Sequence, residues 1–439
     1  MFTANRTRLI WTSFFIFLLM LCNTKAYSKV KDIEGKTLTL DECISIGLRT
    51  NPSAEISLQN MKAVQEKIGE AKGGYYPSFK LSSSYTYTTP LDGNVGASPD
   101  NYDTRFSVKQ TLYDAGATSN LIEGVRQNIK AQEYDVKKTA LDIILNIKSA
   151  FYDVLKRRDI LKVSMTALAT TEKHLAQSKE LYKEGSAPRS DVIKSEVRVS
   201  NAKLDVIKAE NALLSAKANL ATAMGQAVTT DFNVIYHNEG LLPILPSFKD
   251  VLLFAYDQRP ELKGSRARIE SAKASIDQTK SGLYPNLGLD ASYGWQQDEF
   301  SPSEKKWSIG LSVGIPIFEQ LTVKSKISQA AANLNGLKAA ETQTIRNIEL
   351  EVQQAWLSLK EAMERLDVTK KTLEQAEEDM RVSEGRYKEG IGNILEVIDA
   401  QTALTQARTN NVVSLYDIAG SGAKLDRATG KEPMEEINK

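Results

Sequence analysis

The side chains most used in catalysis are scarce in this chain, and their spacing does not suit a reaction site. The sequence has 2 His and 2 Cys among 439 residues. His174 and His237 are far apart, and neither has a partner at a metal-binding spacing such as His-x-x-x-His. The glycines of Gly420–Gly422 precede Leu425, where a nucleotide-binding loop would need its third glycine, so we interpret them as a helix interruption. We therefore expect no enzyme activity, no metal site and no cofactor.

Three carboxylates follow two glycines at related distances. Asp191 lies six residues beyond Gly185, and Glu396 and Asp399 lie six and nine residues beyond Gly390. Glu396 and Asp399 are three residues apart, so they share one face of a helix. Repeated around a symmetry axis, such carboxylates would form acidic rings that attract cations and repel anions. The alternative is that all three are ordinary solvated charges on helix surfaces.

The composition narrows the class of protein that could carry these residues. With 25% charged and 41% hydrophobic residues, the chain is neither wholly disordered nor a polytopic helical membrane protein. Lys and Arg number 56 against 55 Asp and Glu, a net charge of +1. We therefore expect no nucleic acid partner.

The first residues have the pattern of a secretory signal peptide. Arg6 and Arg8 precede the apolar run Leu9–Cys22, and a short polar segment ending at Ala26 follows. The apolar run is shorter than the ~20 residues that a membrane anchor requires. We predict a signal peptide over residues 1–26. After its removal Cys43 is the only cysteine, so no disulfide can form within the mature chain.

The mature chain contains one unit used twice. Tyr182–Gly185 recurs as Tyr387–Gly390, roughly 205 residues later. A second match, at a similar offset, joins Ala71–Pro77 to Thr279–Pro285. The sequence therefore predicts two structural repeats, residues 27–232 and 233–439, each with a helix, a β-hairpin, a long helix and a further helix.

Helical patterns occupy most of each repeat. The predicted helices are residues 42–74, 116–184 and 188–224 in the first repeat, and 248–282, 321–389 and 393–428 in the second. The two longest contain no proline and would each run roughly 100 Å. Gly185 and Gly390 follow them and suit the left-handed conformation that closes a helix. The apolar stripe of the long helices is broad, which favours a wall or tube of helices, although a solid bundle uses the same pattern.

Four short segments alternate apolar with small or polar residues at the period of a β-strand. Their apolar positions are Phe79, Leu81, Tyr85 and Tyr87; Phe106, Val108 and Leu112; Leu287, Leu289, Ala291, Tyr293 and Trp295; and Trp307, Ile309, Leu311, Val313 and Ile315. Each segment is about 10 residues long, the length of a tilted transmembrane strand. Four strands cannot close a barrel, and lipid does not tolerate open edges, so we expect the chain to oligomerise through its strands.

The order and spacing of these features resemble the TolC-like outer membrane efflux protein family. The resemblance rests on the duplication, Asn51-Pro52, Arg259–Leu262, the Tyr-Pro entries to the strands, and the paired Tyr-Lys-Glu-Gly turns. It implies a fold that is mainly α with transmembrane β, in which a homotrimer builds a 12-stranded β-barrel, four strands per chain, continued by a long periplasmic α-helical barrel. It also implies an outer membrane location with a large periplasmic part.

The resemblance implies a function as well. Family members are exit ducts of tripartite efflux or type I secretion systems, passive channels gated at the periplasmic helical tip. Their partners are a periplasmic adaptor (membrane fusion) protein, an inner membrane pump reached through the adaptor, and outer membrane lipid. The scaffold serves drugs, metal ions and polypeptides alike, so the cargo stays open. The alternative class is a non-conducting periplasmic coiled-coil structural or adhesin-like protein, which would not need the amphipathic hairpins.

The same resemblance assigns roles to residues near the two turns. Gly185, Ser186, Gly390 and Ile391 match the tip that docks the adaptor, although Glu184 and Glu389 stand where the family often has Val. Asp191, Tyr387, Glu396 and Asp399 match the periplasmic gate. Gly392 stands where the family can carry an Arg that pairs with the Asp, so this sequence departs from the closing salt bridge.

Overall fold

The computed structural model describes residues 34–88, 99–235, 245–297 and 305–431. The predicted signal peptide lies outside the described residues. The chain divides into two compact units. Unit 1 comprises Met1–Asn51, Asn146–Leu241 and Val368–Tyr416, and unit 2 comprises Pro52–Leu145, Leu242–Asp367 and Asp417–Lys439. Each unit therefore takes segments from both halves of the sequence.

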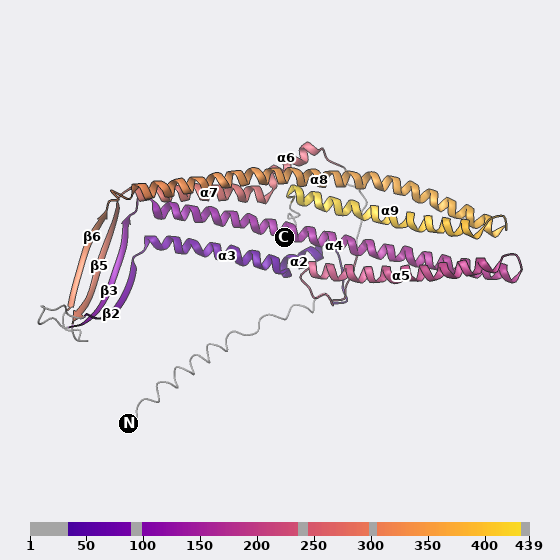
Figure 1. Cartoon of the computed structure of the whole chain (residues 1–439), viewed down its shortest axis with the longest axis horizontal. Coiled ribbons are helices and arrows are strands. Elements are labelled where there is room, and N and C mark those ends of the chain that lie inside the picture. Colours follow the sequence, from indigo (N-terminus) through magenta and orange to yellow (C-terminus); the bar gives the residue numbers. More distant parts are fainter. Residues whose placement is uncertain (1–33, 89–98, 236–244, 298–304, 432–439) are drawn as a thin grey trace, which may run out of the picture. The chain divides into compact units, whose positions relative to one another are not determined.

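The order of elements in the first half recurs in the second (Figure 1). The first half contains β1 (Thr37–Leu38), α2 (Leu40–Thr50), α3 (Pro52–Lys72), the 3-10 turn η2 (Gly73–Tyr75), β2 (Ser78–Tyr87), β3 (Asp100–Tyr113), α4 (Ala117–Lys183) and α5 (Arg189–Ala223). The second contains β4 (Asn233–Val234), α6 (Phe248–Gln258), α7 (Pro260–Lys280), η3 (Ser281–Leu283), β5 (Asn286–Gln297), β6 (Lys305–Gly314), α8 (Gln320–Lys388) and α9 (Ile394–Thr429). The limits predicted for the long helices and their returning partners are confirmed to within about two residues, the usual uncertainty of helix ends.

The first helix of each repeat was predicted as continuous, and this prediction is wrong. The chain leaves the helix at Asn51, with ψ 125°, and at Arg259, with ψ 119°. Both residues precede a proline, whose ring disfavours the helical conformation of the residue before it. Pro52 and Pro260 then begin α3 and α7, a position where the missing N–H costs nothing.

The sheet belongs to unit 2 and consists of four antiparallel strands in the order β2-β3-β5-β6 (Figure 1). The register shifts once, between Thr111 and Tyr113 of β3. Within the described residues β2 and β6 each pair on one side only, so the sheet has two open edges.

The two faces of this sheet differ in chemistry. One row across the strands is Leu81, Phe106, Tyr293 and Trp307. The next row on this face, toward the helices, is also apolar and consists of Phe79, Val108, Ala291 and Ile309. Adjacent positions on the other face carry Ser, Thr, Gly, Asn, Gln and charged residues. The apolar face is unpartnered in the monomer, because Leu81 is 72% and Trp307 75% exposed. The amphipathic hairpins predicted from the sequence are therefore present.

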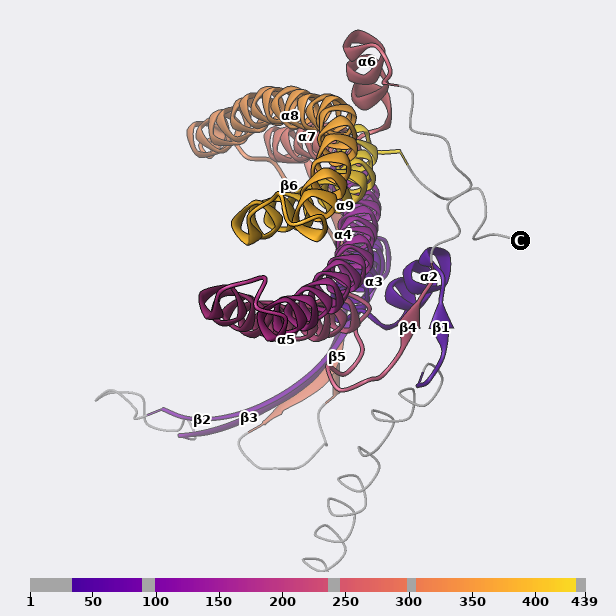
Figure 2. The same cartoon turned by 90° about the vertical axis from the view of Figure 1, so that its right-hand side faces the viewer.

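Helix packing forms the core of each unit. In unit 2 a buried cluster joins α6, α7, α8 and the end of α9, and includes Ala255, Leu262, Val352 and Leu359. In unit 1 the end of α8 packs on the start of α9 through Met380, Tyr387, Ile394 and Val397. Unit 1 also contains a short parallel pair, β1 with β4, near α2 (Figure 2).

No helix in the described part of the chain combines the length and the apolar character needed to cross a membrane.

Candidate functional site

Two nearly identical turns connect the long helices to their returning partners in unit 1. After α4, the amide N–H groups of Ser186 and Ala187 both donate to Leu181 O, at 2.9 and 3.1 Å. After α8, those of Ile391 and Gly392 both donate to Arg386 O, at 3.0 Å. The first turn is Glu184–Ala187 and the second turn is Glu389–Gly392. Both satisfy the last carbonyls of a long helix by the same hydrogen-bond pattern.

These turns require glycine because the backbone is left-handed there, and not because a side chain would lack room. Gly185 and Gly390 both have φ +74°, in the left-handed region, as their predicted role as helix closers requires. A Cβ built at either position would meet no atom within 4 Å. Both turns are therefore open to solvent in the monomer. Ile391, in the second turn, is 71% exposed, an unusual position for a large apolar side chain.

Two of the predicted gate carboxylates occupy the first turn of a returning helix. Asp191 lies at the start of α5, where the helix dipole stabilises a negative charge, and accepts from Ser190 Oγ at 3.3 Å. Glu396 lies at the start of α9 and forms an ion pair of 3.4 Å with Arg386 at the end of α8. Asp399 lies on the exposed surface of α9.

The Arg386–Glu396 ion pair joins the two helices that flank the second turn, α8 and α9. The sequence interpretation missed Arg386, although its signal was present: Arg386 and Glu396 have opposite charges, and each lies five residues from Ile391 in the second turn. Gly392 has no room for a side chain, because its Cβ would lie 2.9 Å from Tyr387 N. The basic group that pairs with Glu396 is supplied by α8.

Tyr387 is buried, unlike the predicted gate residues Glu396 and Asp399, which are exposed. It is only 6% exposed and packs in the core shared by α8 and α9. Its hydroxyl lies 3.4 Å from Ser178 Oγ of α4, which in turn lies 3.1 Å from Ser195 Oγ of α5. A chain of buried hydroxyls thus connects α8, α4 and α5. Tyr182, its counterpart in the first repeat, is 46% exposed, so the two repeats use this position differently.

His174, one helical turn before Ser178 on α4, is also buried on the side that faces α8. His174 is 7% exposed, its Nε2 lies 3.3 Å from Glu384 Oε1 of α8, and neither ring nitrogen has a hydrogen bond of good geometry among the described residues. Burial lowers the pKa of His174, and the opposing charge of Glu384 is too weak to restore it. The imidazole is therefore held neutral within the α4–α8 packing.

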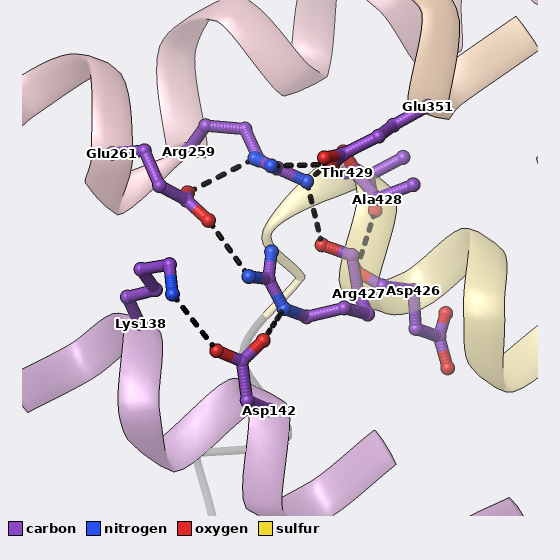
Figure 3. A network of polar contacts seen from close by, with 9 residues as sticks. All are labelled: Lys138, Asp142, Arg259, Glu261, Glu351, Asp426, Arg427, Ala428 and Thr429. Carbon is purple, nitrogen blue, oxygen red and sulfur yellow. Dashed lines mark hydrogen bonds and ion pairs between the residues drawn. The ribbon is translucent and has the colours of Figure 1, made fainter. Parts of the chain in front are cut away.

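A network of charges in unit 2 joins four helices (Figure 3). Arg427, at the end of α9, donates through Nε to Asp142 of α4 at 2.6 Å and through Nη2 to Glu261 of α7 at 2.7 Å. Arg259 donates through Nη2 to Glu351 of α8 at 2.6 Å and through Nη1 to Ala428 O at 3.1 Å. In the sequence, Arg259 and Glu261 stood out only as part of the Arg259–Leu262 segment that carries the family resemblance.

Electrostatics in this network favours the charged forms. Burial alone would raise the pKa of Asp142, but the hydrogen bonds and charges of Arg427 and Lys138 outweigh it and hold that pKa below its ordinary value. For Arg427, burial would lower the pKa, yet Asp142 and Glu261 together raise it. The network links the end of α9 to α4, α7 and α8 by charged hydrogen bonds.

No group of three or more His, Cys, Asp or Glu side chains within the described residues is arranged to hold a metal ion. Cys43 is buried, and burial raises its thiol pKa to about 12, which makes it unreactive.

Comparison with known proteins identifies the fold and the family. The family model described as outer membrane efflux protein matches residues 45–226 and 254–431. Outer membrane protein TolC of Escherichia coli (strain K12) is 23% identical over 404 residues, covering 87% of this chain and 80% of TolC. The solved structure of the outer-membrane channel OprN superposes with a TM-score of 0.77 at 16% identity, covering 94% of this chain and 99% of OprN. A structure of the transmembrane channel protein CusC gives a TM-score of 0.79 at 18% identity, covering 92% of this chain and 95% of CusC.

These likenesses confirm the fold class predicted from the sequence, a mainly helical chain with four strands for an outer membrane β-barrel. The family match spans both halves of the chain. The chain therefore belongs to the outer membrane efflux protein family.

Proposed function

We propose that three copies of this chain form an outer membrane exit duct that conducts cargo passively and is gated at its periplasmic helical tip. The duct would serve a tripartite efflux or type I secretion system. An inner membrane pump would supply the energy, and a periplasmic adaptor would join pump and duct. The observation that carries the proposal is the sheet, which has one exposed apolar face, one polar face and two edges that pair with no other strand among the described residues.

Each property of the sheet has a physical consequence in a membrane. Unpaired backbone groups at β2 and β6 would cost several kcal/mol each in lipid, so β6 of one copy must pair with β2 of the next. Closure then requires several copies, because the smallest usual barrel has eight strands and this chain supplies four. Three copies give the twelve strands of the family's barrel. The apolar face then meets lipid, and the polar face encloses water.

The gate is proposed at Asp191, Tyr387, Glu396 and Asp399. Asp191, Glu396 and Asp399 lie just past the two turns, where threefold repetition would make acidic rings that favour cations. The Arg386–Glu396 ion pair ties the end of α8 to the start of α9. The buried hydroxyl of Tyr387 ties α8 to α4 through Ser178. Opening would separate these helices, so both contacts would favour the closed state.

The adaptor docking tip is proposed at Gly185, Ser186, Gly390 and Ile391. All four lie in the two turns, and the exposed Ile391 offers an apolar contact there. The glycines would leave the backbone open to a partner, since no neighbouring atom lies where a Cβ would stand.

A non-conducting coiled-coil protein is the alternative. The helices alone would fit it, but such a protein has no use for a sheet whose apolar face is exposed over four strands. We therefore favour the duct.

The experiment is reconstitution of the purified mature protein in detergent and in planar bilayers, with two variants of neighbouring residues. We expect chemical crosslinking to end at a trimer and the trimer to give discrete conductance steps. Ile309→Arg, on the apolar face of β6, should reduce insertion, because a cation near the midplane of the lipid face costs about 2–4 kcal/mol. Ser308→Arg, on the polar face, should insert normally. Crosslinking that ends at a dimer, or equal insertion of both variants, would contradict the duct.

A further inference from the structure

The polar face of the sheet carries more positive than negative charge. The strand register places Lys80, Arg105, Lys109 and Lys306 on this face. It places only two acids there, Asp103 and Asp290, among the described strand residues. The remaining positions are neutral. We refer to these four basic residues as the cationic face.

The two acids are already engaged by neighbouring cations. Asp103 Oδ2 lies 2.9 Å from Arg105 Nη2, and Asp290 Oδ1 lies 3.8 Å from Lys109 Nζ. Lys80 and Lys306 form no ion pair within the described part of the chain, and both side chains are exposed. The excess charge therefore resides on Lys80 and Lys306, one on each edge strand.

Glycine leaves room between two of these cations. Arg105 and Lys306 both pair with Gly294, from β3 and β6, so they flank it in one row. Gly294 tolerates no side chain, because its Cβ would lie 2.2 Å from Thr104 O. With strands about 4.8 Å apart, the two basic residues are separated by roughly 10 Å of backbone without a side chain between them. This distance is close to the Debye length in 0.1 M salt, so their fields overlap over the glycine.

One of the two rows beside this one is lined by hydroxyl groups. Lys80 aligns with Ser107, Ser292 and Ser308, and Ser292 Oγ lies 2.9 Å from Ser308 Oγ. Hydroxyls donate hydrogen bonds to anions without adding charge. The face thus combines unpaired ammonium groups, a guanidinium and hydroxyl donors, the groups that recognise phosphate, carboxylate and sulfate.

We propose that the cationic face makes the β-barrel segment of the duct anion-selecting: it favours passage of small inorganic anions and of cargo bearing carboxylate, phosphate or sulfate groups, and it opposes the cation preference proposed for the acidic rings at the helical tip. The inference rests on the proposed function, because the face becomes the wall of a pore only when copies of the chain close the barrel. Each copy brings an excess of two positive charges on this face, so trimerisation surrounds the lumen with them. Low-dielectric walls strengthen such a field.

The sequence offers a matched control in β6. Lys305 and Lys306 are neighbours, but Lys305 pairs with Trp295 on the apolar face, while Lys306 pairs with Gly294 on the polar face. Lys305→Gln and Lys306→Gln remove the same charge from the same strand and differ only in the face that loses it.

The test measures the chloride-to-potassium permeability ratio from reversal potentials of the full mature protein in planar bilayers. Under a KCl gradient near 0.1 M, we expect Lys306→Gln to lower the ratio by about twofold or more and Lys80→Gln/Lys306→Gln to lower it further. Lys305→Gln should leave the ratio unchanged. The differences should vanish near 1 M KCl, where the Debye length is about 3 Å.

Each other outcome has a definite meaning. Equal shifts for Lys305→Gln and Lys306→Gln would overturn the proposal, because the charge would then act without regard to face. Open pores with unchanged ratios in the double variant would also overturn it, while leaving the duct intact. Wild-type protein without any conductance would refute the duct itself. If Lys306→Gln does not assemble, Lys80→Gln on the opposite edge strand makes the same comparison with Lys305→Gln.

Discussion

Arg427 Nη2 donates a hydrogen bond of 2.7 Å to Glu261 Oε1, although 166 positions separate the two residues in the sequence. The bond joins the end of α9 to the start of α7, and the Arg427–Asp142 bond extends it to α4. Both partners of the Arg427–Glu261 pair are largely buried, with side chains 12% and 14% exposed. Removing one member of a buried ion pair destabilises the protein, because the other charge stays buried with less compensation.

Removing Arg427 should therefore destabilise unit 2 strongly. Arg427→Gln leaves Glu261 with Arg259 and Asp142 with Lys138 as the remaining cations. We expect a loss of about 3 kcal/mol in the free energy of unfolding, the lower end of the cost of breaking a buried ion pair. The control is Arg408→Gln, which breaks the more exposed ion pair of 3.1 Å with Glu377 and should cost about 1 kcal/mol or less. Thermal unfolding followed by circular dichroism compares the two. Similar losses in both variants would contradict the structural role assigned to the network.

Acid should weaken unit 1 through His174. Burial lowers the pKa of His174 in the folded state below its ordinary value of 6.5, so the unfolded chain binds more protons at mildly acidic pH. Stability should consequently fall as the pH is lowered through 6.5 toward the depressed pKa of the folded protein. His174→Gln, which does not titrate, should flatten this part of the stability curve, as measured by denaturant unfolding at several pH values.

Glu384 supplies the matched test of the same histidine. Its charge favours protonated His174, so Glu384→Gln should make the acid-induced loss of stability steeper. An unchanged pH dependence in both variants would show that His174 is not the group that titrates.

The fold could be predicted from the sequence wherever local periodicity decides the structure. Apolar residues recur at every second position in Leu287–Trp295 and in Trp307–Ile315. A strand that presents one face to an apolar environment must have this repeat, because its side chains alternate between two faces. Gly185 and Gly390 mark the ends of the long helices because a left-handed residue is cheapest there. These signals are local, and the structure bears them out.

Other features depend on partners that no local pattern identifies. The network of Arg427 with Asp142 and Glu261 forms only when α9 packs beside α4 and α7, so neither charge pattern nor spacing reveals it. The burial of Tyr387 beside Ser178 has the same origin, because its repeat counterpart Tyr182 has the same local sequence and is exposed. The breaks in the helices at Asn51 and Arg259 could have been predicted from the prolines that follow these residues.

Docking of the adaptor should depend on the two turns. Replacing Ser186 and Ile391 by Asp places charges where a partner would have to desolvate them, which opposes association. We expect these variants to lose adaptor-dependent export in cells while crosslinking still detects the trimer. The controls Ser186→Ala and Ile391→Met keep the turns uncharged and should retain export. Normal export by both Asp variants would place the docking surface elsewhere.

Ion selectivity should depend on Glu396 and Asp399. The two carboxylates lie three residues apart on α9, so in a trimer they would form two stacked acidic rings. Glu396→Ala/Asp399→Ala should lower the cation preference of single channels in planar bilayers and weaken block by divalent cations. The Arg386–Glu396 ion pair is also lost in this variant, and its loss should raise the frequency of opening.

A charge-preserving exchange separates these two effects. Glu396→Asp/Asp399→Glu keeps both rings, so selectivity and block should stay near those of the wild type. The shorter side chain at position 396 reaches Arg386 less well, so opening should still become more frequent. Arg386→Gln breaks the same ion pair while leaving both carboxylates, and should likewise raise opening without reducing cation preference. Selectivity and block that remain at wild-type values in the double Ala variant would show that these carboxylates lie outside the conducting path.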